Sequence, residues 1–504
     1  MNRHRLLGFS TALAAAALFA LTAAGCTSPP EGGPAKPIEE FADYLDERIP
    51  QLLDRFGVPG ASIALISEGA PVWSGAYGYA DLESSRPMTI DMVCRAESIS
   101  KSVTAWGIMR LAEEGSIDLD TPVTQQLGGW KLPATEYPPG KITFERLLSN
   151  TAGLPLGTVG PKIEYSPGDD MPSVRDYLEG EVRFIEKPGE KFIYSNVGYN
   201  LMEYSVEQIT DRDFSRYMAE EVLEPLGMDS AWYGWREDFA GRVPRGYEND
   251  GSPVDPYVYP VTGSGGLLAT VEDIARFAAA GMTGEYYGPP ASDVLSEASI
   301  SAIQAPRVGI PGIFGVVAEE YGFGHFIETL PDGRRALWHG GQGHGWMTHF
   351  HIVPEAGGGI VILTNSQRSW PFLAQVLDEW ARWNGFGSVK MGNITTANRI
   401  VASLFGLLIA VTLWMIVRLI LGLIGGRIKF APLAGTNRIG RLLGAAAGFA
   451  IIGVVIWRST LPYIFETSIF PMIIGWGAAA LVFFAGVLIV SALFPRNRSS
   501  RDVT

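Results

Sequence analysis

The sequence predicts an α+β domain over residues 38–390, followed by a region of three transmembrane helices over residues 398–504. Two observations lead to this prediction. In the first region a hairpin pattern comes first, strand patterns come last, and helical patterns lie between them. In the second region three long apolar stretches follow one another, separated by short basic clusters. We therefore expect one sheet whose edge strands come from both ends of the domain, with a lobe of helices inserted.

Each element of the domain is predicted from a local pattern. Residues 38–56 carry apolar side chains at helical spacing and end at Gly57. The β-rich segments 61–66 and 71–77 flank a short turn and form a hairpin. The remaining predicted elements are a helix over 98–113 that stops at Gly115, helices over 199–210 and 271–280, the latter capped by Thr270 and Asp273, and strands over 347–353 and 359–363 joined by a turn at 354–358.

Residues 1–26 are typical of a secretion signal, with a positive start, an apolar middle and small residues before Cys26. The run Ala23-Ala24-Gly25-Cys26 resembles the bacterial lipoprotein cleavage site, which implies lipidation of Cys26, although that pattern usually has a larger aliphatic residue in place of Ala23. An ordinary cleaved signal and an uncleaved anchor are the alternatives. All three place the next domain outside the cytoplasm, and residues 27–37 are predicted to be a flexible tether.

The apolar stretches 400–424, 442–457 and 470–494 are each close to the length that crosses a bilayer. The loop between the first two contains four basic residues and no acid, and the tail after the third contains three arginines. By the positive-inside rule, this loop and the tail lie in the cytoplasm. Three crossings then leave residue 398 outside, in agreement with the secretion signal. The prediction is a multi-pass protein of the bacterial cell membrane with its catalytic domain outside; buried helices of a soluble domain are the alternative.

Charge separates the same two regions. From Arg399 onward there are ten basic and two acidic residues, so the net charge of −14 for the whole chain leaves −22 on residues 1–398. An acidic soluble part argues against nucleic acid as a partner. The expected partners are a small-molecule or peptide substrate and membrane lipid.

Ser98-Ile99-Ser100-Lys101 is the only Ser-x-x-Lys in the chain. Ser98 and Lys101, three residues apart on a helix, lie on one face within contact range. A lysine buried beside a serine can lose its proton and act as the base that activates the hydroxyl. A chain of this length carries roughly one such motif by chance, so the motif alone favours a surface helix with a solvated lysine.

Two further motifs strengthen the case for a nucleophile. Tyr194-Ser195-Asn196 precedes the helix at 199–210, and His339-Gly340-Gly341 leads into the last strands. A second Tyr-x-Asn, at 247–249, lies in a loop rich in Gly and Asp and is discounted. The order Ser-x-x-Lys, Tyr-x-Asn, Lys/His-x-Gly resembles the serine β-lactamases and penicillin-binding proteins, and is closest to class C enzymes, D-alanyl-D-alanine carboxypeptidases and related esterases.

The resemblance covers about residues 40–380. It implies a β-lactamase/transpeptidase-like domain, with an antiparallel sheet, flanking helices and a helical lobe. Further stretches similar to the family are Leu147–Leu154, Glu224–Met228 and Gly265–Leu267.

The resemblance also implies a role for each motif residue. Ser98 forms the acyl-enzyme, and Lys101 takes its proton, shared with Tyr194. Tyr194 protonates the leaving group and then activates the deacylating water, while Asn196 positions Lys101 and the substrate amide. The remaining implied roles are His339 on the far wall, Gly340 and Gly341 in substrate binding, and the backbone N–H groups of Ser98 and Gln342 as the oxyanion hole.

No cofactor and no metal is expected. His344, His349 and His351 cluster after His339, with His349 and His351 on one strand face, but no nearby carboxylate or cysteine completes a ligand set in the sequence. Cys94 is expected to be a small buried residue. Because His339 stands where β-lactamases have lysine, its protonation near pH 6 is the hypothesis for how a substrate carboxylate would be attracted.

The predicted function is that of an extracytoplasmic serine hydrolase, a D-Ala-D-Ala peptidase or an esterase. The alternatives are a true β-lactamase and a penicillin-binding sensor in which acylated Ser98 signals through the membrane helices. Deacylation separates enzyme from sensor, and the presence of Tyr194 favours turnover.

Overall fold

The computed structural model describes residues 37–133, 137–432, 438–460 and 469–495. The predicted signal, the lipidation site Cys26 and nearly all of the tether lie outside the described residues. The chain divides into two compact units, with the boundary between Ile394 and Thr395.

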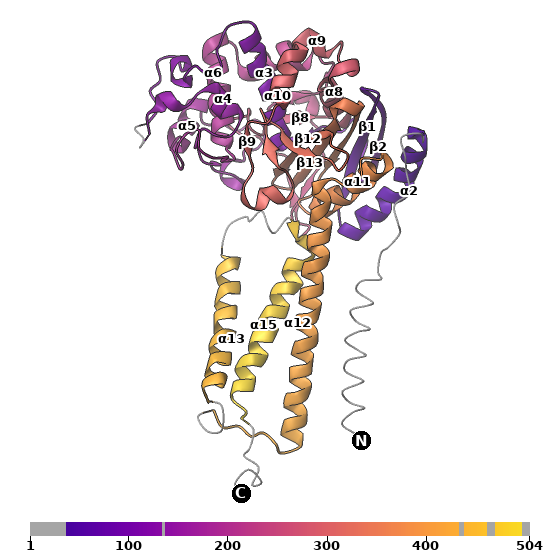
Figure 1. Cartoon of the computed structure of the whole chain (residues 1–504), viewed down its shortest axis with the longest axis vertical. Helices are drawn as coiled ribbons and strands as arrows, with labels where there is room; N and C mark the ends of the chain where they lie inside the picture. The colour runs from indigo at the N-terminus through magenta and orange to yellow at the C-terminus, as the bar shows by residue number, and fades with distance from the viewer. Residues whose placement is uncertain (1–36, 134–136, 433–437, 461–468, 496–504) are drawn as a thin grey trace. The chain divides into compact units, whose positions relative to one another are not determined.

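A nine-stranded antiparallel sheet forms the centre of the first unit (Figure 1). Its order is β3-β2-β1-β14-β13-β12-β11-β10-β9. The sequence prediction was wrong about the edges. The first and last segments of the domain, β1 and β14, pair with each other inside the sheet, and the edges are the two-residue strands β3 and β9. The bounds are β1 Gly60–Ser67, β2 Ala70–Asp81, β3 Arg86–Pro87, β9 Val308–Gly309, β10 Glu320–Tyr321, β11 Phe326–Thr329, β12 Arg335–Gly343, β13 Trp346–Val353 and β14 Gly358–Thr364.

Helices cover both faces of this sheet, so the inner strands are buried on both sides. In Figure 1 the strands lie between α8 (Val271–Ala280) and the pair formed by α2 (Ile38–Phe56) and α11 (Trp370–Trp383). The pair joins the two ends of the domain through stacked rings of Phe41 and Trp383 and a buried ion pair of Arg48 with Glu379.

The inserted lobe contains α3 (Ser100–Glu113), α4 (Phe144–Leu148), α5 (Val174–Glu181), α6 (Asn196–Thr210) and α7 (Phe214–Met218). A second small sheet consists of β4, β8 and β5 (Cys94–Arg95, Leu267–Ala269 and Trp232–Tyr233). Its strand β4 is followed along the chain by the turn that leads into α3. The predicted helices are confirmed with small shifts of their ends. Residues 97–99 form a separate 3-10 turn, η1, before α3, and α6 starts three residues earlier than predicted. The predicted cap of α8 is present, with Thr270 and Asp273 bonded to each other's backbone N–H.

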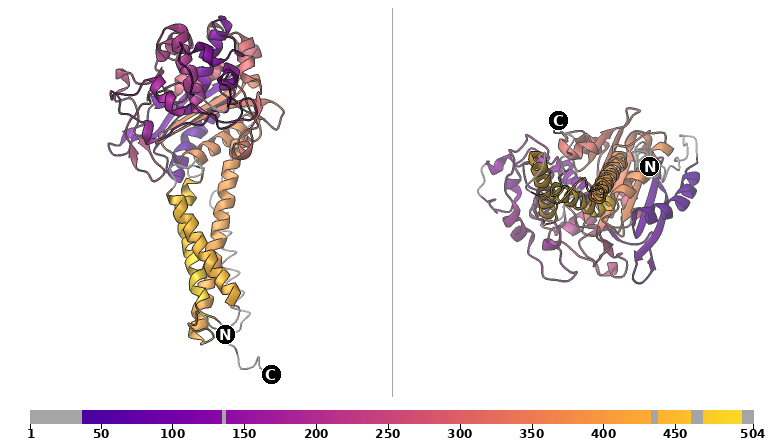
Figure 2. Two further views of the ribbon diagram at one scale, coloured as in Figure 1. Left: turned by 90° about the vertical axis from the view of Figure 1, so that its left-hand side faces the viewer. Right: turned by 90° about the horizontal axis from the view of Figure 1, so that it is seen from below.

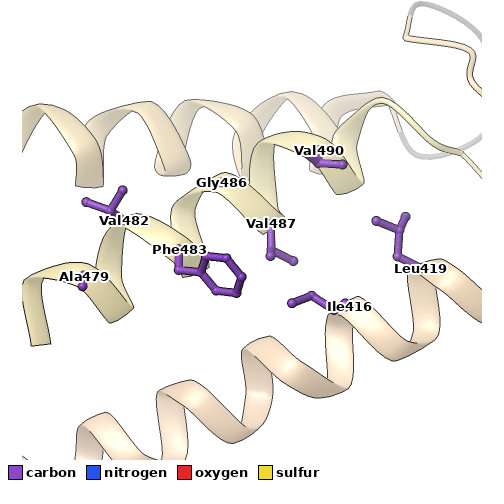
Figure 3. Close-up of a pocket in the computed structure, with 8 residues that line it drawn as sticks. All are labelled: Ile416, Leu419, Ala479, Val482, Phe483, Gly486, Val487 and Val490. Carbon is purple, nitrogen blue, oxygen red and sulfur yellow. The ribbon is translucent and has the colours of Figure 1, made fainter. Parts of the chain in front are cut away.

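The second unit contains three long helices, α12 (Asn393–Ile424), α13 (Arg438–Ser459) and α15 (Pro471–Ala492) (Figures 1 and 2). All three are long and apolar enough to cross a membrane, and few of their residues are buried. A groove with a volume of about 650 Å³ lies between α12 and α15. Figure 3 labels the residues that line it, which are Ile416, Leu419, Ala479, Val482, Phe483, Gly486, Val487 and Val490. Apolar side chains exposed along whole helices are stable in lipid rather than in water.

Candidate active site

Ser98 lies on a tight turn between the small sheet and α3. The turn is tied to β8 by a hydrogen bond from the Ala96 N–H to the Leu267 carbonyl, 2.9 Å long. Glu97 has the left-handed φ of +49°, which is uncommon for a residue with a side chain. Ser98 is half-buried, whereas Ile99, Ser100 and Lys101 are fully buried. The sharp turn therefore presents the Ser98 side chain at the surface of an otherwise buried helix end.

Lys101 makes three short contacts inside the lobe. Its Nζ lies 2.8 Å from Asn196 Oδ1, 2.7 Å from the Ser264 carbonyl oxygen and 3.2 Å from Ser98 Oγ. A neutral amine has two N–H bonds and one lone pair. The amide and carbonyl oxygens can only accept, so they take the two N–H bonds, and the lone pair is left for the Ser98 hydroxyl. The contacts thus suit Lys101 as the acceptor of the serine proton.

The protonation of Lys101 agrees with this geometry. Burial lowers the pKa of its amine to about 7, and the negative charge of Glu97 opposes the effect in part. A substantial fraction of Lys101 is then neutral near pH 7, which is the form that a general base requires.

The Tyr194-Ser195-Asn196 segment is fixed from both sides. The Ser195 N–H donates to Asn150 Oδ1 at 3.0 Å, and its hydroxyl caps α6 by accepting from the Gly198 N–H. Tyr194 is thereby held with its ring centroid 4.8 Å from Lys101 Nζ, and its phenol hydrogen-bonds with Ser98. Burial raises the pKa of the phenol, partly offset by the Ser98 hydrogen bond, so Tyr194 is a proton donor at neutral pH.

The loop that holds Lys101 was missed by the sequence analysis. Glu203 on α6 accepts from the N–H groups of Thr262 and Gly263, both at 2.7 Å, and Asn200 accepts from the Ser264 N–H. These bonds aim the Ser264 carbonyl at Lys101. The glycines of Gly265–Leu267 were the available signal, since this stretch is similar to the family but was given no role. Burial raises the pKa of Glu203 to about 8.

Strand β12 lies against the nucleophile turn because it is rich in glycine. A Cβ on Gly341 would come within 2.2 Å of the Ala96 carbonyl oxygen, and one on Gly343 within 2.2 Å of Glu97 Oε1. Gln342 lies between them, and its side chain accepts from Trp370 Nε1 at 3.1 Å. The backbone that was expected to carry an oxyanion hole is thus on the strand that packs against the Ser98 turn. Gly340 lies on the same strand, opposite His349.

His339 differs from the expectation. Its ring is fully buried among Phe326, Tyr321 and Tyr194, and its Nδ1 lies 2.9 Å from the carbonyl of Gly340. Burial, together with the positive charge of Lys101, holds the pKa of His339 well below its usual range. The hypothesis that His339 gains a proton near pH 6 and attracts a substrate carboxylate is therefore wrong, since a buried imidazole beside a lysine stays neutral there.

The later histidines lie in two separate places. His349 and His351 share a strand face as expected, 3.4 Å apart between their nitrogens. Carboxylates that are distant in sequence do lie near two of these histidines. Glu328 lies 3.6 Å from His351, while His344 contacts both Glu164 and Glu248. In the described part of the chain, no group of three or more His, Cys, Asp or Glu side chains is arranged to hold a metal ion.

The two remaining sequence interpretations concern Cys94 and the discounted Tyr-x-Asn. Cys94 is fully buried, as expected, and burial raises the pKa of its thiol to about 12. The Tyr247 hydroxyl accepts from the Leu82 N–H at 2.7 Å, at the β2 side of the sheet. The tyrosine of this second Tyr-x-Asn thus makes a structural hydrogen bond with the Leu82 backbone.

The family model described as Beta-lactamase matches residues 45–378. A protein of Aspergillus campestris named unguisins hydrolase ungD' is 27% identical over 354 residues, covering 66% of this chain and 64% of that protein. Protein flp of Staphylococcus aureus is 26% identical over 208 residues, 41% of each chain. The chain spans less than two thirds of the length of these two curated relatives.

Solved structures show the same architecture. The octameric penicillin-binding protein homologue from Pyrococcus abyssi is 28% identical, with a TM-score of 0.57 over 67% of this chain and 77% of that one. SurE is 24% identical, with a TM-score of 0.57 over 70% of this chain and 77% of that one, and shows the fold alone.

Proposed function

The chain belongs to the beta-lactamase family, whose members are generally serine hydrolases, and on that premise we propose that it hydrolyses its substrate through an acyl-enzyme on Ser98. The observation that carries the proposal is the arrangement of Lys101 Nζ, with two oxygen acceptors at 2.7 and 2.8 Å and Ser98 Oγ at 3.2 Å. Such an arrangement leaves the lone pair of a neutral lysine facing the nucleophile.

The proposed reaction starts when Ser98 Oγ attacks the substrate carbonyl carbon and its proton passes to Lys101. The N–H groups of Ser98 and Gln342 stabilise the oxyanion, a role supported by the packing of β12 against the nucleophile turn. Tyr194 gives a proton to the leaving group, and Lys101 can replace it. In deacylation Tyr194 passes its own proton to the neutral Lys101 as it takes one from the attacking water, and the proton held by Lys101 then moves to Ser98 Oγ as the acyl bond breaks.

The substrate class is proposed as an ester or a peptide-type amide whose reacting end is uncharged. In related β-lactamases a lysine at the position of His339 stays cationic and attracts a carboxylate. The buried and neutral His339 supplies no such charge. This favours a neutral ester or amide over a D-Ala-D-Ala peptide or a penicillin, both of which carry a carboxylate. The fungal relative named as a hydrolase is consistent with hydrolysis by this fold.

The second candidate is a sensor that stays acylated and signals through α12, α13 and α15. The hydrogen bond between Tyr194 and Ser98 supports turnover instead, because it places the Tyr194 hydroxyl beside the Ser98 ester bond that deacylation must break. Accumulation of a stable acyl-enzyme would favour the sensor.

We also propose that the three apolar helices anchor the protein in the bacterial cell membrane, with the catalytic domain outside the cytoplasm. Support comes from their length and hydropathy and from the basic loop between the first two. Lipidation of Cys26 stays a prediction from the sequence.

The direct test is labelling with a fluorescent fluorophosphonate, followed by turnover assays on short neutral esters, neutral amides and D-Ala-D-Ala peptides. Ser98→Ala should lose labelling and lower turnover by about 10⁴-fold or more, with an unchanged melting temperature, because one half-exposed hydroxyl contributes little to stability. Labelling that persists in Ser98→Ala, or that maps to Ser100, would overturn the proposal.

A further inference from the structure

The residue directly before the nucleophile is strained and buried. Glu97 combines a left-handed φ of +49° with a side chain that is only 3% exposed. A non-glycine residue in this region is sterically strained, and it persists only where the surroundings hold it. Burial of a carboxylate adds a further cost unless it is paired. A glycine at position 97 would avoid both the backbone strain and the burial of a charge. The contacts of the Glu97 side chain must therefore explain why a glutamate is present.

The Glu97 carboxylate has partners on both oxygens. Arg95 Nε donates to Oε1 at 2.7 Å and the Tyr257 hydroxyl at 3.1 Å, while the Tyr259 hydroxyl donates to Oε2 at 3.2 Å. The Arg95 guanidinium in turn lies over the rings of Tyr257 and Tyr259, 3.9 and 4.5 Å from their centroids. These contacts join β4, the nucleophile turn and the segment at 257–259 into one buried unit.

The surrounding backbone leaves room for this carboxylate. A Cβ on Gly343 would overlap both of its oxygens, and one on Gly265 would lie 3.6 Å from Oε2. The Glu97 main-chain carbonyl also accepts from the Ser100 hydroxyl at 2.6 Å. The Glu97 side chain is bonded to Arg95, which precedes Ser98 in the chain, and the Glu97 carbonyl is bonded to Ser100, which follows it. These contacts fix both ends of the turn.

The charge of Glu97 also acts on the base. Lys101 faces Ser98, Asn196, the Ser264 carbonyl, the rings of Tyr194 and Tyr199, and the neutral His339. Burial lowers the pKa of Lys101, and Glu97 is the charged group that opposes this lowering. The Arg95 guanidinium is paired with the Glu97 carboxylate through Nε.

We propose that Glu97 is a positioning residue for the proposed hydrolase, which fixes the Ser98 turn through Arg95, Tyr257 and Tyr259 and supplies a negative charge that acts on Lys101. The inference rests on the proposed function of Ser98. It predicts that removing the charge makes Lys101 easier to deprotonate, while a neutral side chain of the same shape keeps the turn folded.

The experiment measures the rate of Ser98 acylation by a fluorophosphonate from pH 5 to 9 in the full chain. Glu97→Gln should move the acidic limb of the profile to lower pH by about one unit, because loss of a nearby opposite charge lowers the pKa of a lysine. The double variant Arg95→Gln with Glu97→Gln leaves no unpaired buried charge and should move the limb in the same direction by a smaller amount, because the Arg95 cation is removed as well. It keeps the test valid if the single variant fails to fold.

Glu379 provides a matched control. It is also a buried carboxylate bonded to an arginine and a tyrosine, Arg48 and Tyr44, but it lies between α2 and α11. Glu379→Gln should lower the melting temperature without moving the acidic limb. A limb that stays at the wild-type pH in both Glu97 variants would overturn this inference alone. No labelling of Ser98 in the wild type would overturn the proposed function, and this inference with it.

Discussion

A lysine can act as a base at neutral pH only if its surroundings favour the neutral amine. Lys101 meets this condition through burial, and its pKa of about 7 lies more than three units below the usual value of about 10.4. Asn196 and Ser264 are neutral acceptors, so they orient the amine without the strong preference for a cation that a carboxylate in their place would impose.

The first prediction concerns this titration. The rate of Ser98 acylation in the wild type should rise with pH through about 7 and then level off, because the neutral fraction of Lys101 increases over that range. Lys101→Arg keeps a cation that cannot lose its proton, and should lower the rate by about 100-fold to 10,000-fold at pH 8, where the wild-type amine is mostly neutral, and by less at pH 5. A rate that is independent of pH from 5 to 9, or an active Lys101→Arg, would show that Lys101 is not the base.

His339 leads to a second prediction at the same scale. Because its pKa is held well below the usual range, it stays neutral from pH 5.5 to 8. The ratio of kcat/KM for a C-terminal D-Ala peptide to that for a neutral ester should therefore be flat across this range, since the titration of Lys101 cancels in the ratio. A ratio that rises on acidification would mean that His339 does gain a proton and bind the carboxylate.

These residues show what the sequence could and could not predict. Ser98, Lys101, Tyr194 and Asn196 come together as expected, because the spacing of Ser-x-x-Lys on a helix and the Tyr-x-Asn before α6 determine local geometry. The burial of His339 depends on rings from the preceding strands β10 and β11 and on the ring of Tyr194, which comes from the inserted lobe, far away in sequence. Spacing alone carries no information on such neighbours.

At the scale of elements, His344 connects the helical lobe with the turn between β12 and β13. Its Nδ1 lies 2.7 Å from Glu164, in the lobe, and its Nε2 lies 2.9 Å from Glu248, which follows β6 (Gly246–Tyr247). Hydrogen bonds with these carboxylates, first of all Glu164, raise the pKa of His344 to about 9. At neutral pH the imidazolium therefore holds two loops at the end of β12.

A third prediction follows from this raised pKa. The contribution of His344 to stability is complete below its unfolded-state pKa of about 6.5 and is lost as pH rises through about 9. The melting temperature should fall by about 2 °C more in the wild type than in His344→Gln between pH 7 and 10, since glutamine has no charge to lose. Equal falls in the two proteins would show that the ion pairs do not contribute.

Elements with strong local signals agree best with their predictions. α2 and α8 begin and end at the predicted residues, because apolar spacing and caps define them. The position of β1 beside β14 could not be predicted in the same way, because strand order is set by packing between segments about 300 residues apart. The nucleophile turn is a similar case, since the φ of Glu97 depends on the contacts of its side chain.

For the whole molecule, the two compact units suggest that the catalytic domain folds without the apolar helices. The first unit extends to Ile394, and Met391 and Ile394 are buried, so a boundary at residue 394 keeps its core whole better than one at 390. The fourth prediction is that residues 38–394 are soluble and acylate Ser98 at the rate of the full chain. Aggregation of this fragment, with activity only in the membrane-bound chain, would contradict independent folding.

Topology is tested by access of a protease from outside intact cells. The catalytic domain should be digested, while the basic loop Arg427–Arg441 should be spared until the cells are permeabilised. Cleavage of that loop in intact cells would mean that the orientation is inverted.

In the proposed mechanism Ser98 forms an acyl-enzyme, with Lys101 as the base for its formation and Tyr194 as the proton donor and acceptor for its hydrolysis. Intact-protein mass spectrometry during turnover of a short neutral ester tests this claim most directly. We expect an acyl adduct on Ser98 that decays as product appears. The adduct should be absent in Lys101→Arg, and it should accumulate in Tyr194→Phe because deacylation is slowed. Hydrolysis that continues in Ser98→Ala, or an adduct on any other residue, would contradict it.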